Sequence, residues 1–470
     1  MKEIRKLVRI YDDLLKNKTS KFIRKSFNPK EESLFQLYQT DVSENTISKE
    51  LYNSTPSHQS FQSLKRSLLD KLYSIVISTN VSKSYNKQRL DVGRELLVVK
   101  VLSVFSLRSL MVAIAEKTLK KSLKLHMYNE SADLARILSE HHQAFSVNKF
   151  KGKEYHDLAV KCNRIFGLEI EYNWRYQTFR SYYGTPAFEN SAAEMGQVAD
   201  ELEAIMDLHS SRLAFYCFDL RFFHHYIKAD YNALVNICYE AINYYDSLNF
   251  NHSAARNIFV FHLIEVFLNF NVLDKAEESI IEFLKDSDKR NVSHYRYKEL
   301  LLRLYLNQAN LTQAQEVFDY LKGSVRRSSN IYNKDRYILY EMYIAILAGN
   351  TLNFRRINYN MNKIKKDKKG MHVPFLIAQA IYFYLNDPDK LIDKLDALNQ
   401  YSYKYLKEEK FERTRQFIKI LNRIMNLKDY SDIKISVASE QINNNGIEMV
   451  SYENLLKILE TRKNMIWEYA

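Results

Sequence analysis

Histidine and acidic side chains are the residues of this sequence that could hold a metal ion. Adjacent histidines occur at 141–142 and at 224–225. Neighbouring residues on a helix point about 100° apart, so an adjacent pair rarely binds one ion. His262 and Glu265 stand three apart, which suits a helical ligand pair, but no second pair accompanies them. We therefore expect no metal site and no cofactor.

Nucleophilic and phosphate-binding motifs are missing as well. Cys162, Cys217 and Cys238 are separated by 54 and 20 intervening residues, which indicates neither a disulfide framework nor a zinc knuckle. No serine lies in a Gly-x-Ser-x-Gly turn. The two closest of the nine glycines, Gly184 and Gly196, are twelve apart, so the sequence has no glycine-rich phosphate loop. We expect a protein that is not an enzyme and has no catalytic residues.

The apolar segments are too short to place the chain in a membrane. The longest, Val373–Leu385, has about thirteen residues, whereas a span needs about 20. The first seventeen residues mix both charges and hold no apolar run typical of a signal peptide. We expect a cytoplasmic protein with reduced thiols and no membrane partner.

Helical periodicity dominates the elements that would have to position any site. Apolar residues recur at intervals of three and four from Phe61 to Ser78, and similar patterns predict helices over Val92–Ser103 and Leu110–Tyr128. Strand-like alternation is confined to a short stretch at Ile433–Val437. With 46% hydrophobic residues the chain can bury a continuous core. The sequence predicts an all-α protein.

A helix pair recurs through the second half of the chain. In each pair an aromatic-rich helix ends at a polar turn, and an amphipathic helix begins on a residue suited to cap it. The expected N-caps, at intervals of 41, 39, 40 and 37, are Asp230, Asn271, Asn310, Asn350 and Asp387. Gln313 and Pro388 support two of these starts. Stacked pairs of this kind form an α-solenoid of antiparallel helix pairs.

These units resemble tetratricopeptide-like repeats. The fragments that carry the resemblance are Asn271–Ala276 and Ala309–Ala314, each with a turn followed by the small residue of a second helix. The repeat length is about 39 residues here and 34 in the family. The resemblance implies a curved superhelix that binds peptides or protein surfaces and has no chemistry of its own.

The chain divides into four predicted regions. Residues 1–80 form a helical N-terminal region, 81–206 hold divergent helices, 207–428 hold the repeats, and 429–470 form a C-terminal segment with a capping helix. Within 1–80 a short helix, a polar turn and a longer helix are similar to the helix-turn-helix of winged-helix domains. The net charge is +11 over residues 1–130, −6 over 131–300 and +8 over 301–470.

Two sets of residues are candidates for contact with a partner. On the repeats the candidates are Tyr216, Tyr226, Tyr297, Tyr337, Tyr340, Arg355, Arg356, Lys363, Lys365 and Lys366. On the N-terminal helix they are Lys65, Arg66 and Lys71, which would contact nucleic acid.

Our first functional hypothesis is a non-catalytic scaffold or adaptor that binds a protein or peptide along the helical repeats. The alternative is a nucleic-acid-binding regulator, in which the basic N-terminal region contacts DNA and the repeats sense or recruit.

Overall fold

The chain folds into α-helices throughout the part described by its structure, a computed structural model. The described residues are Ile4, Val8, 27–40, 42–78, 85–144, 148–182, 186–248, 250, 252–286, 292–325, 331–350, 372–407, 411–426 and 448–467. No strand occurs among them. The all-α prediction is confirmed for these residues, and the expected stretch Ile433–Val437 lies outside them.

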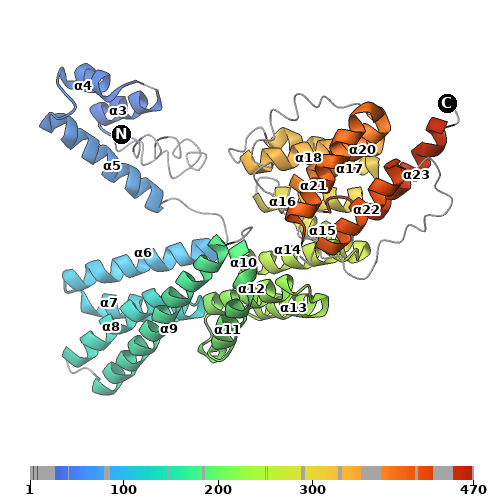
Figure 1. The fold of residues 1–470 in the computed structure, drawn as a ribbon. Helices are drawn as coiled ribbons and strands as arrows, with labels where there is room; N and C mark the ends of the chain where they lie inside the picture. Colours follow the sequence, from blue (N-terminus) through green and yellow to red (C-terminus); the bar gives the residue numbers. More distant parts are fainter. Residues whose placement is uncertain are drawn as a thin grey trace. The chain divides into compact units, whose positions relative to one another are not determined.

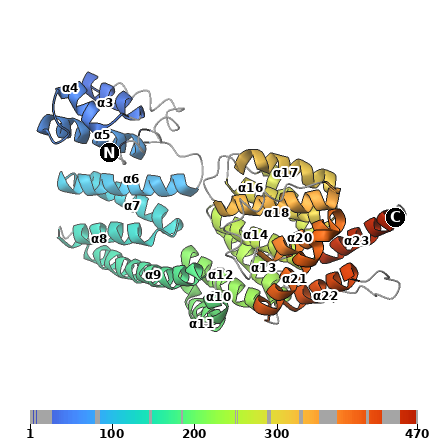
Figure 2. The same ribbon diagram turned by 45° about the horizontal axis from the view of Figure 1, so that its top comes forward.

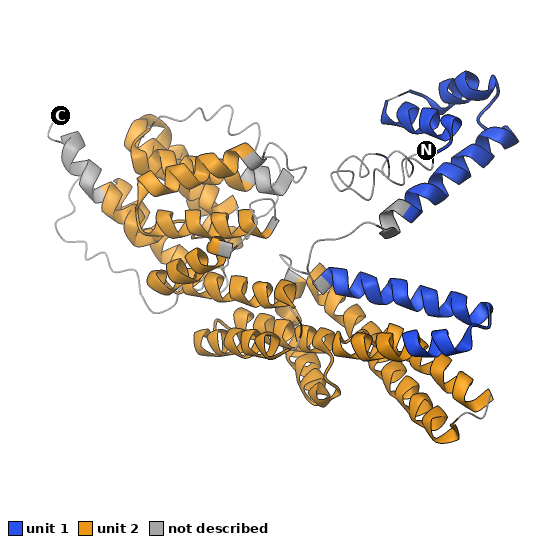
Figure 3. Cartoon of the chain, turned by 180° about the vertical axis from the view of Figure 1, so that it is seen from behind, with its two compact units in different colours: residues 1–114 blue, residues 115–470 orange. Residues whose placement is uncertain are grey.

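The helices belong to two compact units, residues 1–114 and residues 115–470 (Figure 3). The division falls inside the predicted segment 81–206, and the four predicted regions stay predictions. The first unit holds α3 (Pro29–Gln39), α4 (Glu44–Tyr52), α5 (Gln59–Ser78), α6 (Tyr85–Val104) and the start of α7 (Arg108–Lys124). Helices α3, α4 and α5 pack on one another around Phe35, Ile47 and Phe61. The short helix, turn and long helix expected here are present.

The second unit is a series of helical hairpins. Its first members are α8 (Tyr128–Ala144), α9 (Lys149–Ser181), α10 (Pro186–Asn190), α11 (Ala192–Glu203), η1 (Met206–Leu208), α12 (Ser211–Ile227), α13 (Tyr231–Ser247), α14 (Ser253–Asn269) and α15 (Leu273–Asp286). The later ones are α16 (Val292–Asn307), α17 (Leu311–Val325), α18 (Ile331–Ala348), α20 (His372–Asn386), η3 (Pro388–Lys390), α21 (Leu391–Tyr405), α22 (Glu412–Asn426) and α23 (Tyr452–Trp467).

Successive helices of this unit pack on their neighbours, and the hairpins stack as an α-solenoid (Figures 1 and 2). Buried apolar side chains form one continuous core from Tyr172 on α9 to Leu459 on α23. Ala276 and Ala314 are fully buried, which lets the second helix of each hairpin approach the first closely. The predicted solenoid architecture is therefore confirmed.

The same backbone turn follows α12, α14, α16 and α18. Ala229, Asn271, Ala309 and Gly349 all have positive φ angles, between 55° and 76°. In each turn the amide of the residue after the left-handed one donates to the carbonyl of the residue five positions before it, as in a Schellman motif. The intervals between these left-handed residues are 42, 38 and 40. The repeat is thus a property of the backbone and not only of the sequence pattern.

Two of the five expected caps are confirmed. The Asp230 side chain accepts from the amide of Ala233 at 3.1 Å, and the Asn310 side chain accepts from that of Gln313 at 3.3 Å. Asn350 lies beside residues that the structure does not describe.

The other two expected caps are corrected. Asn271 is not an N-cap but the left-handed residue that ends α14, because asparagine tolerates this conformation better than most residues. Asp387 precedes the 3₁₀ turn η3, and α21 begins only at Leu391. The predicted helix Leu110–Tyr128 is also interrupted, since His126 is left-handed and the Met127 amide bonds to the Ser122 carbonyl.

The C-terminal helix α23 returns to the middle of the second unit. The Ser451 amide donates to the Asn307 side chain at the end of α16, over 2.8 Å. Arg413 on α22 binds Glu448 and Glu453 at 2.9 Å and 2.8 Å, which ties the start of α23 to α22. Helix α23 therefore packs as part of this core.

Candidate protein-interaction surface

Three of the five candidate tyrosines are buried. Tyr216, Tyr297 and Tyr340 each donate a hydrogen bond to an earlier helix, which is α9, α14 and α16 in turn. Their acceptors are the Asn173 side chain at 2.9 Å, the Asn257 carbonyl at 2.9 Å and the Glu299 side chain at 3.0 Å. These tyrosines hold successive hairpins together, and a docking partner would not reach them on the surface.

Tyr226 and Tyr337 are only partly buried. Tyr226 stacks on Phe222 with ring centroids 5.9 Å apart, and Tyr337 meets Tyr340 edge to face at 6.1 Å. Their contact with a partner stays a prediction. Arg355, Arg356, Lys363, Lys365 and Lys366 lie outside the described residues.

The nucleic-acid candidates on α5 are mostly engaged within their own unit. Lys71 lies 2.6 Å from the buried carboxylate of Glu31, and Lys65 lies 2.5 Å from Glu44. Arg66 is exposed. Residues 27–78 carry five lysine or arginine and six aspartate or glutamate residues, a net charge of −1. The positive charge of residues 1–130 therefore lies outside α3, α4 and α5, and contact of Lys65, Arg66 and Lys71 with nucleic acid stays a prediction.

The histidines singled out in the sequence are not assembled into a metal site. His224 Nδ1 lies 2.6 Å from the Ala192 carbonyl oxygen, and His262 Nε2 lies 3.1 Å from Asp219. His142 stacks on Tyr155 with centroids 5.7 Å apart. Among the described residues no group of three His, Cys, Asp or Glu side chains is placed to hold a metal ion.

Helix α9 presents the surface that the sequence did not reveal. It is 33 residues long, and its N-cap is Asn148, whose side chain accepts from the Lys151 amide at 3.1 Å. One side of the helix is buried, with Cys162, Ile165 and Tyr172 facing the interior. The opposite side is exposed along much of its length.

Besides Phe150 near its start, α9 exposes three large apolar side chains. Val160, Ile170 and Trp174 are 56%, 57% and 75% exposed, and we call them, with Gly167, the α9 face. Val160, Gly167 and Trp174 follow one another at steps of seven, so they lie along one stripe about 20 Å long. A Cβ placed on Gly167 would meet no atom within 4 Å, so the middle of the stripe is open.

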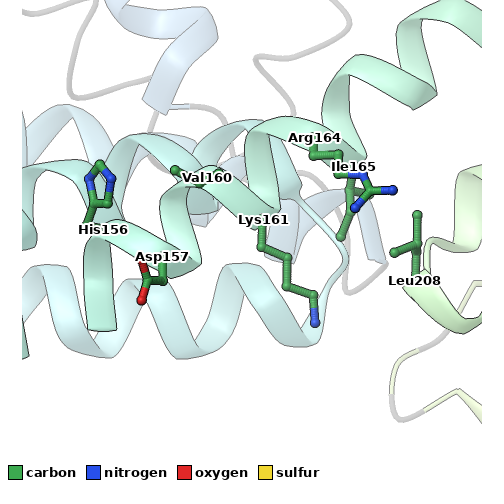
Figure 4. A pocket seen from close by; sticks show the side chains of 7 residues that line it. All are labelled: His156, Asp157, Val160, Lys161, Arg164, Ile165 and Leu208. Carbon is green, nitrogen blue, oxygen red and sulfur yellow. The ribbon is translucent and has the colours of Figure 1, made fainter. Parts of the chain in front are cut away.

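An open hollow of about 520 Å³ adjoins the stripe (Figure 4). The hollow is lined by Leu208 of η1 and by six residues of α9: His156, Asp157, Val160, Lys161, Arg164 and Ile165. Lys161 and Arg164 give the middle of α9 a positive charge that Asp157 offsets only in part. The hollow therefore suits an acidic or polar group beside the apolar stripe.

The buried side of α9 is anchored by polar contacts on both α11 and α12. Ser210 donates to the buried carboxylate of Glu169 at 2.7 Å, and Arg175 binds Glu201 at 2.5 Å. The hydrogen bond from Arg175 lowers the pKa of Glu201. The Tyr176 hydroxyl donates to Asp219 at 2.7 Å, and burial followed by the Asp219 charge raises the pKa of Tyr176. These contacts fix the orientation in which the α9 face meets solvent.

Sequence reasoning missed the α9 face because it searched the repeats for tyrosines. A usable signal was present, since one of only two tryptophans follows Val160 and Gly167 at steps of seven.

No family model, no curated protein and no solved structure matches this chain. Among the described residues, no helix combines the length and the apolar character that crossing a bilayer requires.

Proposed function

We propose that this chain is a non-catalytic scaffold that binds a protein partner on the α9 face. The observation that carries the proposal is Trp174, 75% exposed on a helix whose opposite side is firmly anchored. Exposed tryptophans beside other apolar residues are typical of interaction sites, and tryptophan is among the residues that contribute most to binding.

Binding here would depend on contact area. Trp174 and Ile170 would supply the apolar anchor, and Lys161 and Arg164 would pair with acidic groups of the partner at the rim. A rigid helix loses little conformational freedom when it binds, which favours affinity. The resemblance to tetratricopeptide-like repeats belongs to this proposal and is supported by the hairpins and the buried Ala276 and Ala314. A cytoplasmic location is also part of this proposal, and the three buried free cysteines support it.

Photo-crosslinking of the full chain tests the proposal. A benzophenone amino acid placed at Ile170 should yield a discrete crosslinked protein in cell extract. The matched control carries the same group at Ile392, which is 66% exposed on α21 and should yield none. Equal labelling from both positions, or none from Ile170, would contradict a partner site on α9.

Affinity for the crosslinked protein should then depend on the same stripe. Trp174→Ala combined with Ile170→Ala should weaken binding by at least about tenfold, because interface anchors contribute about 2 kcal/mol or more. The control, Tyr403→Ala with Ile392→Ala, removes exposed apolar surface elsewhere and should leave affinity unchanged. Gly167→Arg should also weaken binding, because its side chain would fill the open middle of the stripe.

A further inference from the structure

Helix α6 carries a second exposed apolar surface. Leu90, Leu97, Val101 and Val104 are between 45% and 81% exposed, although the opposite side of α6 buries Val92 and Val99. Val98 and Phe105 widen the exposed side. A surface helix normally has a single apolar stripe, so large apolar side chains on both sides of α6 are unusual. An exposed apolar stripe of this kind is typical of a binding surface.

The spacing of this stripe matches that of a helical partner. Together with two cations, the exposed apolar residues follow alternating steps of three and four, and we call this set the α6 seam: Lys87, Leu90, Arg94, Leu97, Val101 and Val104. Such steps average 3.5 residues, the repeat by which two helices keep their side chains in contact. Gly93 beside the seam has no atom within 4 Å of an added Cβ, so a second helix has room to approach.

The charges of α6 argue against a parallel second copy of this chain as the occupant. Lys87 and Arg94 stand seven residues apart, at equivalent positions of the seam. Two parallel seams in register would therefore bring like charges together. Arg94 contacts Asp91 at 3.3 Å on the surface, a pairing that is weak in water. A lipid surface is the other candidate occupant, since Arg89 and Lys100 flank the seam as well as Asp91 and Glu95, and binding to anionic vesicles is one outcome of the test below.

We propose that the α6 seam binds an amphipathic helix of another protein, with apolar residues in the same register and carboxylates opposite Lys87 and Arg94. This inference rests on the proposed scaffold function. It gives the chain a second docking surface, which selects an apolar helix with acidic side chains. Apolar contacts along Leu97, Val101 and Val104 supply affinity, and the carboxylates select the partner.

A synthetic helical peptide of about 20 residues tests the proposal against the full chain by fluorescence anisotropy. The peptide carries leucine in the seam register and glutamate opposite the two cations, and a matched peptide carries lysine in place of glutamate. We expect saturable binding of the glutamate peptide and at least about tenfold weaker binding of the lysine peptide. Arg94→Glu should reverse this preference, which a merely structural role of Arg94 would not do.

Two variants separate this surface from the α9 face. Val101→Asp should weaken the glutamate peptide by at least about tenfold, because it places a charge in the seam. Trp174→Ala should leave peptide affinity unchanged, so failure of the α9 proposal would not be mistaken for failure of this one. Equal affinity for the two peptides would overturn the proposal. So would self-association abolished by Val101→Asp, or binding to anionic vesicles in preference to the glutamate peptide.

Discussion

His262 Nε2 lies 3.1 Å from Asp219 Oδ1, inside the core where α9, α12 and α14 meet. The same carboxylate accepts from the Tyr176 hydroxyl at 2.7 Å through its other oxygen, and it has no exposed surface. One buried charge therefore joins helices α9, α12 and α14 of the solenoid. A buried carboxylate is stabilised only if such partners surround it.

This contact makes stability depend on pH. Burial by itself would lower the pKa of His262, but the hydrogen bonds and charges of Asp219 and Glu265 outweigh it and raise the pKa to about 9. A raised pKa in the folded state stabilises the fold fully below the unfolded value of about 6.5. That contribution is lost as the pH rises through about 9. We expect urea unfolding to show a loss of up to about 3 kcal/mol over this range.

His262→Gln should abolish this pH dependence and destabilise the protein at neutral pH. His156→Gln removes an exposed histidine and serves as the control, with the wild-type profile expected. A wild-type profile in His262→Gln as well would show that the buried pair does not control the transition.

The left-handed turns predict a gain in stability from glycine. Ala229 and Ala309 have φ angles of 56° and 55°, a conformation that costs residues with a Cβ about 1 kcal/mol. Ala229→Gly and Ala309→Gly should each raise the free energy of unfolding by about 0.5 to 1 kcal/mol. Gly349→Ala, in the equivalent turn, should lower it by a similar amount. Urea or thermal unfolding measures all three, and the same sign for all of them would count against the shared turn.

Two glycines inside helices should respond in opposite ways to alanine. A Cβ on Gly196 of α11 would lie 2.8 Å from the ring of His224, which is held by the Ala192 carbonyl. Gly196→Ala should therefore destabilise the protein by about 1 to 3 kcal/mol. Gly167→Ala meets open space and should stabilise it by about 0.5 to 1 kcal/mol through helix propensity. Thermal unfolding of the two variants decides the point.

The three cysteines should be inert in the folded protein. Burial raises the pKa of Cys162 to about 11 and that of Cys217 to about 12, and it also raises the pKa of Cys238. Only the thiolate reacts rapidly, so a thiol reagent such as DTNB should label none of them natively and all three in urea. Fast native labelling of any cysteine would show that the hairpin around it opens.

The buried Glu31 should be essential for the first unit. It accepts from the Asn28 amide, from Ser67 at 2.6 Å and from Lys71 at 2.6 Å. Although burial opposes the charge, these partners lower the pKa of Glu31, so its stabilising effect is lost as the pH falls below about 4.5. Glu31→Ala should destabilise α3–α5 by about 3 kcal/mol.

Hydrogen exchange of α3, α4 and α5 checks this expectation at neutral pH. Exchange in these helices should speed up in Glu31→Ala and stay unchanged in Glu50→Ala, which removes an exposed carboxylate from α4. Equal protection in both variants would be inconsistent with a structural role for Glu31.

Features set by neighbours along the chain could be predicted from the sequence. The helices, the hairpins and the caps at Asp230 and Asn310 depend on a few consecutive side chains. The two wrong predictions, at Asn271 and at His126, both concern a left-handed residue that ends a helix. Asparagine suits both an N-cap and a left-handed position, and histidine gives no strong turn signal.

Features set by contacts between distant helices could not be predicted in this way. Tyr216 and Tyr340 look the same in sequence whether they line a groove or join two hairpins, because their burial depends on a helix about 40 residues away. Trp174 and Leu97 are exposed because, among the described residues of its own unit, no helix covers either side chain.

The sequence by itself thus determined the all-α solenoid, whose helices and turns follow from interactions over a few residues. The tertiary structure alone decided which aromatic side chains are buried and which faces are left uncovered. The physical reason is that burial of a side chain depends on the surfaces that meet it, and these come from residues far away along the chain.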